Sequence, residues 1–483
     1  MKKVLCLIFI TVFIGICFVP LAGQIFGHKN VNAEKRELAV LPKLMTPQGL
    51  NMGYTKELDD YFTDNFAFRT DLITVNAKLY AAIFAQSVSD KVIIGKDGWL
   101  FFAPTVNDYT KNHVLSDNEI YRLEKTLEIQ KSTLQDRGIS FIFMIAPNKS
   151  SIYGQYMPDR FLQVGTISNA EKLFSAFDAE GFDYLNLFTA LRGNDTQLYH
   201  KLDTHWNNYG AMIGYNALLK KVTEMDPAFS YDSHEGLVPT PERSWSGDLS
   251  AMLYPTSNQL DMEYIFPVAK KYKTDRPIRS MEDLTISTTC ETGSENLLMF
   301  RDSFANALIP LMSNEFASVT YSRATPYDYS QLQDSTDVVV LEIAERNLPN
   351  LLLQAPLLPT APAAFAENIT PAKMDITSKV IDSADSFRIF GLALPPEYRA
   401  DKNYDIYIRL HSADGVYTFT AFPILEDGYF KEDTAKANAA FSLMINKSSL
   451  PAGKYTMEVV VRDPSGTCYG GTDETAVITI PDK

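Results

Sequence analysis

The stretch Leu297-Leu298-Met299-Phe300-Arg301-Asp302-Ser303-Phe304-Ala305-Asn306 decides the fold of this chain. Four apolar residues run into Asp-Ser-Phe, and beyond Ser303 the apolar residues follow helical spacing, at Phe304, Ala307, Leu308, Leu311 and Met312. A buried strand that enters a helix through a sharp turn presents a serine hydroxyl at the end of a sheet, where hydrolases and acyltransferases hold their nucleophile. Alternatively, Ser303 is only a helix N-cap that accepts a hydrogen bond from a free backbone amide.

Strand and helix patterns alternate around this stretch. Residues 117–137 and 170–179 have the spacing of amphipathic helices, whereas residues 141–145 and 338–343 are apolar runs typical of buried strands. Repeated β-α units of this kind indicate an α/β fold with a mostly parallel sheet and helices on both faces. Sites in such sheets form beyond the carboxyl ends of the strands, and Ser303 falls at such an end.

Composition excludes some classes of partner. The chain has 483 residues, of which 46% are hydrophobic and 21% charged, so it has room for two or more domains with a large core. Its formal charge of −15 argues against nucleic acid, because phosphate binding needs a basic surface. The four cysteines have no zinc-type spacing; a disulfide between Cys290 and Cys468 is possible, but two free thiols are favoured.

The N-terminus is apolar. Residues 4–22 follow two lysines and approach the length of about 20 residues that spans a bilayer. This is a signal peptide or, as we favour, an uncleaved signal anchor within residues 1–26. The lysines place the N-terminus in the cytoplasm, so the rest of the chain works outside the membrane. Helical runs follow in residues 56–84, around Leu58, Phe62, Leu72, Val75, Leu79 and Ile83.

The chain divides into further regions by composition. Residues 34–353 hold the alternating β-α pattern and form the main domain. Residues 354–373 are rich in proline and alanine and are expected to be a linker. Residues 374–483 contain short alternating runs separated by turns, which predict a small antiparallel β-sandwich.

A second polar stretch supplies partners for the serine. In an extended segment, Asp203 and His205 point to the same face, which suits a carboxylate that orients an imidazole. A serine nucleophile needs a base within hydrogen-bond reach, and the base needs an orienting group, so Ser303, His205 and Asp203 supply all three roles. The alternatives are a capping Asp and a surface His at a turn, or a metal site from His200, Asp203 and His205 that lacks a clear further ligand.

The run Asp203-Thr204-His205-Trp206-Asn207-Asn208-Tyr209-Gly210-Ala211, followed later by Asp-Ser-Phe, resembles the SGNH-hydrolase-like family of alginate O-acetyltransferases and the related DHHW proteins. In that family the Asp-x-His element also precedes the serine in sequence. Supporting pieces occur in the same order within residues 34–350, namely Glu34-Lys35-Arg36-Glu37-Leu38, Asn65-Phe66-Ala67-Phe68-Arg69, Gly95-Lys96-Asp97-Gly98-Trp99-Leu100-Phe101, Pro147-Asn148-Lys149 and Glu345-Arg346.

The resemblance implies an SGNH-hydrolase-like three-layer parallel sheet with helices on both faces, preceding the antiparallel β-sandwich. It implies Ser303 as nucleophile, His205 as base and Asp203 as its orienter, with no metal and no cofactor. Two positions depart from the family pattern: Thr204 stands where the DHHW name has His, and Arg301 where a Gly-Asp-Ser motif has Gly. Arg301 is therefore a substrate or oxyanion contact, or a surface residue. The other candidates for shaping the substrate site are Trp206, Asn207, Asn148, Lys149 and Arg346.

The implied function is an extracytoplasmic O-acetyltransferase that moves an acetyl group through an acyl-serine onto a cell-surface or exported polysaccharide. The implied partners are the polysaccharide, the membrane through the N-terminal anchor, and a membrane-bound acyltransferase that supplies acyl groups. The alternatives are a carbohydrate acetyl esterase, and a non-catalytic glycan-binding or cell-wall protein that uses the C-terminal sandwich.

Overall fold

A six-stranded sheet forms the centre of the main domain in the computed structural model, which describes residues 2–26, 37–47, 49–426 and 434–481. Its strand order is β5 (Ser140–Ala146), β12 (Val338–Ala344), β10 (Ser294–Phe300), β11 (Phe316–Ser322), β9 (Thr285–Thr289) and β8 (Lys273–Thr274). The first four strands are parallel; β9 pairs antiparallel with β11, and β8 pairs antiparallel with β9 at the edge. The sheet is therefore mixed, with the predicted parallel part at the site.

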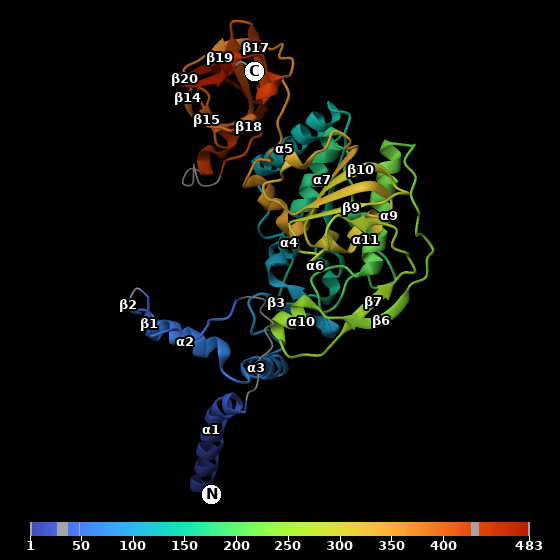
Figure 1. Ribbon diagram of the computed structural model, residues 1–483, viewed down its shortest axis with the longest axis vertical. Helices are drawn as coiled ribbons and strands as arrows, with labels where there is room; N and C mark the ends of the chain where they lie inside the picture. The colour runs from blue at the N-terminus through green and yellow to red at the C-terminus, as the bar shows by residue number, and fades with distance from the viewer. Residues whose placement is uncertain (1, 27–36, 48, 427–433, 482–483) are drawn as a thin grey trace.

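Helices cover both faces of this sheet, as predicted (Figure 1). Successive residues of a strand point to opposite faces, so Leu298 and Phe300 pack with α5 (Asp117–Gln135) and α7 (Asn169–Glu180). Leu297 and Met299 pack instead with α9 (Asn208–Met225). Because this central strand is buried on both faces, its sequence does not alternate between apolar and polar residues.

The helix after Ser303 is shorter than the spacing predicts. A 3₁₀ helix, η4 (Phe304–Ala307), is followed by α11 (Ile309–Met312), which is only one turn long. Pro310 lies in that turn; it has no N–H to donate to the preceding turn, so a continuous helix through this point is disfavoured. The apolar face still packs into the core, because Phe304, Leu308 and Met312 are fully buried.

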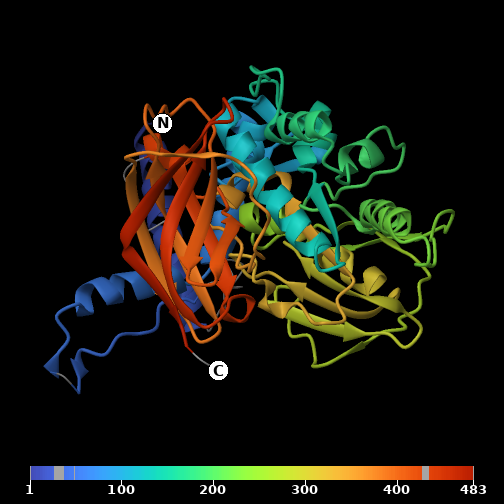
Figure 2. The ribbon, with the colours of Figure 1, turned by 90° about the horizontal axis from the view of Figure 1, so that it is seen from above.

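The C-terminal residues form two facing sheets (Figure 2). One has the order β13 (Ile369–Pro371), β20 (Cys468–Ile480), β19 (Gly453–Arg462), β16 (Asp405–Ser412) and β17 (Gly415–Thr420); the other has β14 (Asp375–Asp382), β15 (Ser386–Leu394) and β18 (Ala440–Asn446). They enclose a separate apolar core, and all pairs except β13 with β20 are antiparallel. The expected linker, residues 354–373, contributes β13 and bridges from Pro359 and Ala363, so it lies against the sandwich.

The N-terminal helices project from the main domain, and the last of them packs against it, where Thr74 bonds with Thr256 (Figure 1). Helix α1 (Lys2–Ile25) contains the one segment of the described residues that is long and apolar enough to cross a membrane, Lys3–Ile25, as a signal sequence also would be. The helical region of residues 56–84 is divided into α2 (Tyr54–Asn65) and α3 (Arg69–Phe84). Residues 34–36, which begin the predicted main domain, lie outside the described residues.

Both cysteines beyond the N-terminal segment are free thiols, as favoured from the sequence. Cys290 is buried beside β11, where its Sγ donates to the carbonyl oxygen of Asn314. Cys468 lies in the sandwich and donates to Glu367.

Candidate active site

Ser303 lies just beyond the carboxyl end of β10, between the ends of β12 and β11. Its backbone angles, φ −73° and ψ −19°, are those of a right-handed helical turn and carry no strain. Within the described residues its side chain makes no capping hydrogen bond to η4, so the N-cap interpretation is wrong. The hydroxyl Oγ instead lies 2.8 Å from Nε2 of His205.

Asp302 fixes the turn that presents the serine. One of its carboxylate oxygens accepts a hydrogen bond from the backbone N–H of Phe304 at 2.9 Å. The other accepts from the backbone N–H of Ala344 at 2.6 Å and from the side-chain amide of Asn347 at 3.1 Å. The aspartate therefore ties the end of β10 to the end of β12, and this tie does not require a glycine in the turn.

His205 is held between Ser303 and Asp203. Its Nδ1 lies 2.7 Å from Oδ1 of Asp203, and the backbone N–H of His205 donates to the same oxygen at 2.9 Å. The second oxygen of Asp203 accepts from Nε1 of Trp245 at 3.0 Å and from the backbone N–H of Asp248 at 2.9 Å. Four donors thus converge on one buried carboxylate, which leaves Nε2 of His205 as the nitrogen that faces the serine.

The electrostatics of the pair follow from this arrangement. Burial by itself would lower the pKa of His205, but the hydrogen bond and charge of Asp203 outweigh it and raise that pKa above its usual 6.5. Burial would raise the pKa of Asp203, yet the bonds it accepts from His205 and Asp248 lower it well below the usual range. Asp203 is therefore a carboxylate at neutral pH. Burial, and then the charge of Asp203, raises the pKa of Asp248.

The segment that carries Asp203 and His205 is a narrow loop closed by a bridge between Tyr199 and Trp206. Inside it, the buried ammonium of Lys149 donates to three backbone carbonyls at 2.5–3.1 Å, those of His200, Lys201 and Asp203. Burial lowers the pKa of Lys149 to about 7, against the nearby charges of Asp203, Asp248 and Asp261. Lys149 therefore holds the loop in place from inside.

Trp206 and Asn207 also make their polar contacts within the protein. Nε1 of Trp206 donates to the backbone carbonyl of Phe304 at 3.0 Å, which joins the loop to the turn after Ser303. Asn207 is the N-cap of α9, because its side-chain oxygen accepts from the backbone N–H groups of Tyr209 and Gly210. Both side chains are at most 2% exposed, so these contacts position the loop and leave no surface for a substrate.

Arg301 is not the surface residue that one alternative expected. It is 3% exposed, and its guanidinium donates to Oδ1 of Asn306 and to the backbone carbonyl of Met281. Burial lowers its pKa to about 10. Asn148 is buried as well, and it donates through its backbone N–H to Glu345 and through its side-chain amide to Asp108.

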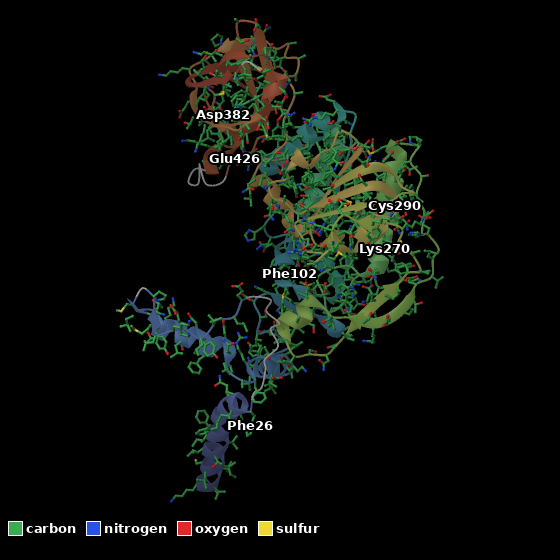
Figure 3. All side chains as sticks on the ribbon, in the orientation of Figure 1. Phe26, Phe102, Lys270, Cys290, Asp382 and Glu426 are labelled. Atoms are coloured by element: carbon green, nitrogen blue, oxygen red, sulfur yellow. The ribbon has the colours of Figure 1, made fainter. Side chains whose placement is uncertain are left out.

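Arg346 is the predicted substrate contact that stays near the surface. Its guanidinium lies over the ring of Phe304 at 5.3 Å and over the ring of Phe102, which Figure 3 labels, at 5.7 Å. Its charge acts to lower the pKa of His205, so it lies within electrostatic reach of the imidazole. Its buried Nη1 has no hydrogen-bond partner among the residues that the structure describes. An anionic group at this point would satisfy that nitrogen.

The metal alternative is not formed by the three residues proposed for it. His200 is 1% exposed, stacks on Trp245 and turns its Nε2 towards Glu263 at 3.4 Å. Among the described residues, the donor atoms that come within 4.8 Å of one another are those of Asp203, His205 and Asp248. Asp203 already accepts four hydrogen bonds, and Asp248 accepts from the backbone and hydroxyl of Thr204. This donor set suits an imidazole-orienting network.

Comparison with known proteins finds a similar domain. Residues 92–284 match the sequence model described as "SGNH hydrolase-like domain, acetyltransferase AlgX". This part of the chain is similar to the SGNH hydrolase-like domain of AlgX-type acetyltransferases. The resemblance to O-acetyltransferases of this type is therefore confirmed, and the matched residues include Asp203 and His205.

Two curated relatives and several solved structures are similar. Probable alginate O-acetylase AlgJ of Pseudomonas fluorescens is 23% identical over 192 residues, which are 37% of this chain and 45% of that protein. The AlgJ protein of Pseudomonas aeruginosa is 26% identical over 168 residues, 34% of this chain and 41% of the relative. The chain thus spans less than half the length of these relatives.

Among solved structures, Bacillus cereus PatB1 has a TM-score of 0.42 at 17% identity and covers 53% of this chain and 96% of its own. A DHHW family protein of Eubacterium siraeum has a TM-score of 0.40 at 14% identity, with coverage of 54% and 92%. The O-acetyltransferase domain of Pseudomonas putida AlgJ has a TM-score of 0.35 at 19% identity, with coverage of 53% and 92%.

Thr204, which departs from the DHHW name, and Arg301, which departs from a Gly-Asp-Ser motif, both have structural explanations. The hydroxyl of Thr204 donates a hydrogen bond to the carboxylate of Asp248 at 2.8 Å, so this short side chain anchors the loop to Asp248. The guanidinium of Arg301 bonds to Asn306 and to the backbone carbonyl of Met281, while Asp302 builds the turn. Sequence reasoning did not find Trp245 or Asp248, although both bind Asp203. They follow it by about forty positions with no motif of their own, so only the folded chain connects them.

Proposed function

We propose that this chain is an extracytoplasmic O-acetyltransferase that transfers an acetyl group through Ser303 onto a hydroxyl of a cell-surface or exported polysaccharide. One observation supports this most directly: Oγ of Ser303 lies 2.8 Å from Nε2 of His205, whose Nδ1 lies 2.7 Å from Asp203. A hydroxyl, an imidazole and a buried carboxylate that are hydrogen-bonded in this order are the parts of an acyl-transfer triad.

In the first half-reaction, Nε2 of His205 takes the proton of Ser303 as Oγ attacks the carbonyl carbon of an acetyl donor. The tetrahedral oxyanion is stabilised by the backbone N–H of Ser303, with the positive charge of Arg346 within electrostatic reach of His205. Such a backbone donor contributes about 3 kcal/mol to the stabilisation of the transition state. The bond to the leaving group breaks, the leaving group takes the proton from His205, and acetyl-Ser303 remains.

In the second half-reaction, a polysaccharide hydroxyl gives its proton to Nε2 of His205 and attacks the acetyl-serine. The Ser303–acetyl bond breaks, Ser303 regains the proton, and the acetylated sugar leaves. Water in place of the sugar hydroxyl would give hydrolysis, so the difference between transferase and esterase lies in which acceptor is held and whether water is excluded. The curated relatives are named for alginate; for this chain we propose a polysaccharide without naming it.

The proposed location is the outer face of the cell membrane. The large apolar side chains described for helix α1 are exposed, and the helix has the apolarity of a membrane span, which supports a role as signal anchor. An anchor would keep the domain beside a membrane-bound acyltransferase, which we propose as the source of acetyl groups.

The test is an assay with an acetyl ester in the presence and absence of oligosaccharide acceptors. Acetylated sugar supports the transferase, whereas acetate alone supports the esterase. Ser303→Ala should lower turnover by about 10⁶-fold, because loss of a triad serine removes the nucleophile. Ser175→Ala, on the exposed side of α7, is the matched control. Turnover unaffected by Ser303→Ala would exclude both enzymatic functions.

A further inference from the structure

Helix α3 exposes its large apolar side chains. Leu72, Val75, Leu79 and Ile83 are 41%, 52%, 58% and 70% exposed. Their spacing of three and four residues puts them on one face of the helix. A helix that packs on a soluble domain normally turns such a stripe to the core, so the exposed stripe calls for another covering surface.

The opposite face of α3 is buried although it carries small and polar residues. Thr70, Thr74 and Ala77 are at most 4% exposed. The hydroxyl of Thr74 donates to the backbone carbonyl of Thr70 and accepts hydrogen bonds from the backbone N–H and hydroxyl of Thr256, at 3.1 and 3.0 Å. These contacts fix the rotation of α3 about its axis, so the apolar stripe points away from the domain.

The start of α3 touches the end of α1. A Cβ placed on Gly23 would lie 2.4 Å from Cε2 of Phe68, the residue that precedes α3, so the two segments are in direct contact there. Figure 1 shows α3 beside the C-terminal end of α1, and Figure 3 labels Phe26 at that end. If α1 spans the membrane with its lysines in the cytoplasm, this end marks the outer surface of the bilayer.

We propose that α3 lies in the outer interface of the membrane, with its stripe of Leu72, Val75, Leu79 and Ile83 inserted among the lipids. The contact between Gly23 and Phe68 holds the start of α3 against the end of α1, and both helices expose large apolar side chains, which favours the same lipid as the covering surface. The exposed rings of Tyr80 and Phe84 lie 4.7 Å apart at an angle of 47°, and aromatic rings are enriched at this depth.

The lipid contact is apolar rather than ionic. The preceding helix α2 carries Glu57, Asp59, Asp60 and Asp64 against one lysine, Lys56, so an anionic headgroup layer would be repelled rather than attracted. The inference rests on the proposed anchoring of α1. Helix α3 would be a second membrane attachment close to α1. Two attachments restrict how the domain, and with it Ser303, rotates relative to the membrane.

The experiment uses the full chain in neutral phosphatidylcholine vesicles, with and without bromine atoms on the acyl chains. Leu79→Trp introduces a reporter into the stripe, and Val416→Trp introduces one at a 46% exposed position of β17 in the sandwich. The emission spectrum of the parent protein is subtracted from that of each variant, because the parent already contains three tryptophans. The Leu79→Trp emission should shift to the blue and lose intensity with bromolipids, whereas the Val416→Trp emission should do neither.

Flotation of the vesicles distinguishes the anchoring of α1 from the docking of α3. Protein that floats while the Leu79→Trp reporter emits as in water overturns the docking of α3 and leaves the anchor in place. Protein that does not float overturns both. A blue-shifted reporter without bromine quenching, in a protein that behaves as a dimer in detergent, would show that a second copy covers the stripe and would likewise overturn the proposal.

Discussion

Asp203→Asn is the substitution that most directly tests the proposed role of the carboxylate. Asp203 accepts four hydrogen bonds, from two N–H groups of His205, from Trp245 and from the backbone of Asp248. An asparagine offers one oxygen and one NH₂ group in the same space, so only one of the two pairs of donors can be kept. Two bonds to a charged acceptor are lost, each worth about 1.5–3 kcal/mol, so folding stability should fall by about 3–6 kcal/mol at most.

The orientation that the amide adopts also determines the chemistry. If the oxygen keeps Trp245 and Asp248, the NH₂ group donates to Nδ1 of His205, which forces the proton onto Nε2. Nε2 then donates to Ser303 and cannot take its proton. We expect kcat to fall by about 10⁴-fold, as for the corresponding change in other triads, which corresponds to about 5.4 kcal/mol of transition-state stabilisation.

The pH dependence provides an independent check. The base must be neutral to act, and Asp203 raises the pKa of His205, so the acid limb of the activity profile should lie above pH 6.5, with activity lost as the pH falls through it. Without the carboxylate, burial remains and acts to lower that pKa, so the residual activity of Asp203→Asn should have its acid limb at a lower pH.

The assay is hydrolysis of an acetyl ester between pH 5 and 9, with circular dichroism to confirm folding. Asp159→Asn is the matched control, because the Asp159 side chain is 90% exposed and pairs only with Lys96 among the described residues. A folded Asp203→Asn enzyme with wild-type kcat, or with an unshifted acid limb, would refute the role of Asp203 as the orienting group.

Two further predictions concern the loop that carries Asp203 and His205 and the helix α9 that follows it. Gly210→Ala would place a Cβ 2.5 Å from the backbone oxygen of Leu198, so it should lower the free energy of unfolding in urea by about 1–3 kcal/mol. Gly214→Ala is the control: its Cβ would have no contact under 3.4 Å, so it should raise the free energy of unfolding by about 0.5–1 kcal/mol. Equal effects of the two substitutions would contradict the crowding at Gly210. Lys149→Met leaves three carbonyl groups without their donor, so it should lower the free energy of unfolding by about 3–5 kcal/mol. Lys454→Met, on the exposed side of β19, is the control and should change that free energy little. Similar losses for the two variants would show that Lys149 does not hold the loop.

Much of the central fold could be predicted from local pattern. The run from Leu297 to Phe300 is apolar at every position, which is typical of a strand buried on both faces. Its position before Asp-Ser-Phe therefore places Ser303 at the carboxyl end of a central strand. Asp203 and His205 were recognisable because their types and spacing suit one chemistry.

The grouping of charged and polar residues around the site could not be predicted. Lys149 and Arg346 are both cations that follow a strand end, yet Lys149 is buried beneath the loop and Arg346 lies near the surface beside His205. Trp245 and Asp248 reach Asp203 from a distant segment. Burial and hydrogen-bond partners are properties of the packed chain, so residue type alone does not distinguish a structural cation from a substrate contact.

The sequence by itself determined which residues share a face, and the tertiary structure decided what covers that face. The periodic run of Leu72, Val75, Leu79 and Ile83 indicates a helix with an apolar stripe, and α3 is such a helix. Its threonines, however, are the residues that face the domain, because Thr74 bonds with Thr256. Ser303 and His205 are similarly separated by 98 positions and meet at 2.8 Å. Periodicity is a local property, whereas contact depends on how distant segments pack.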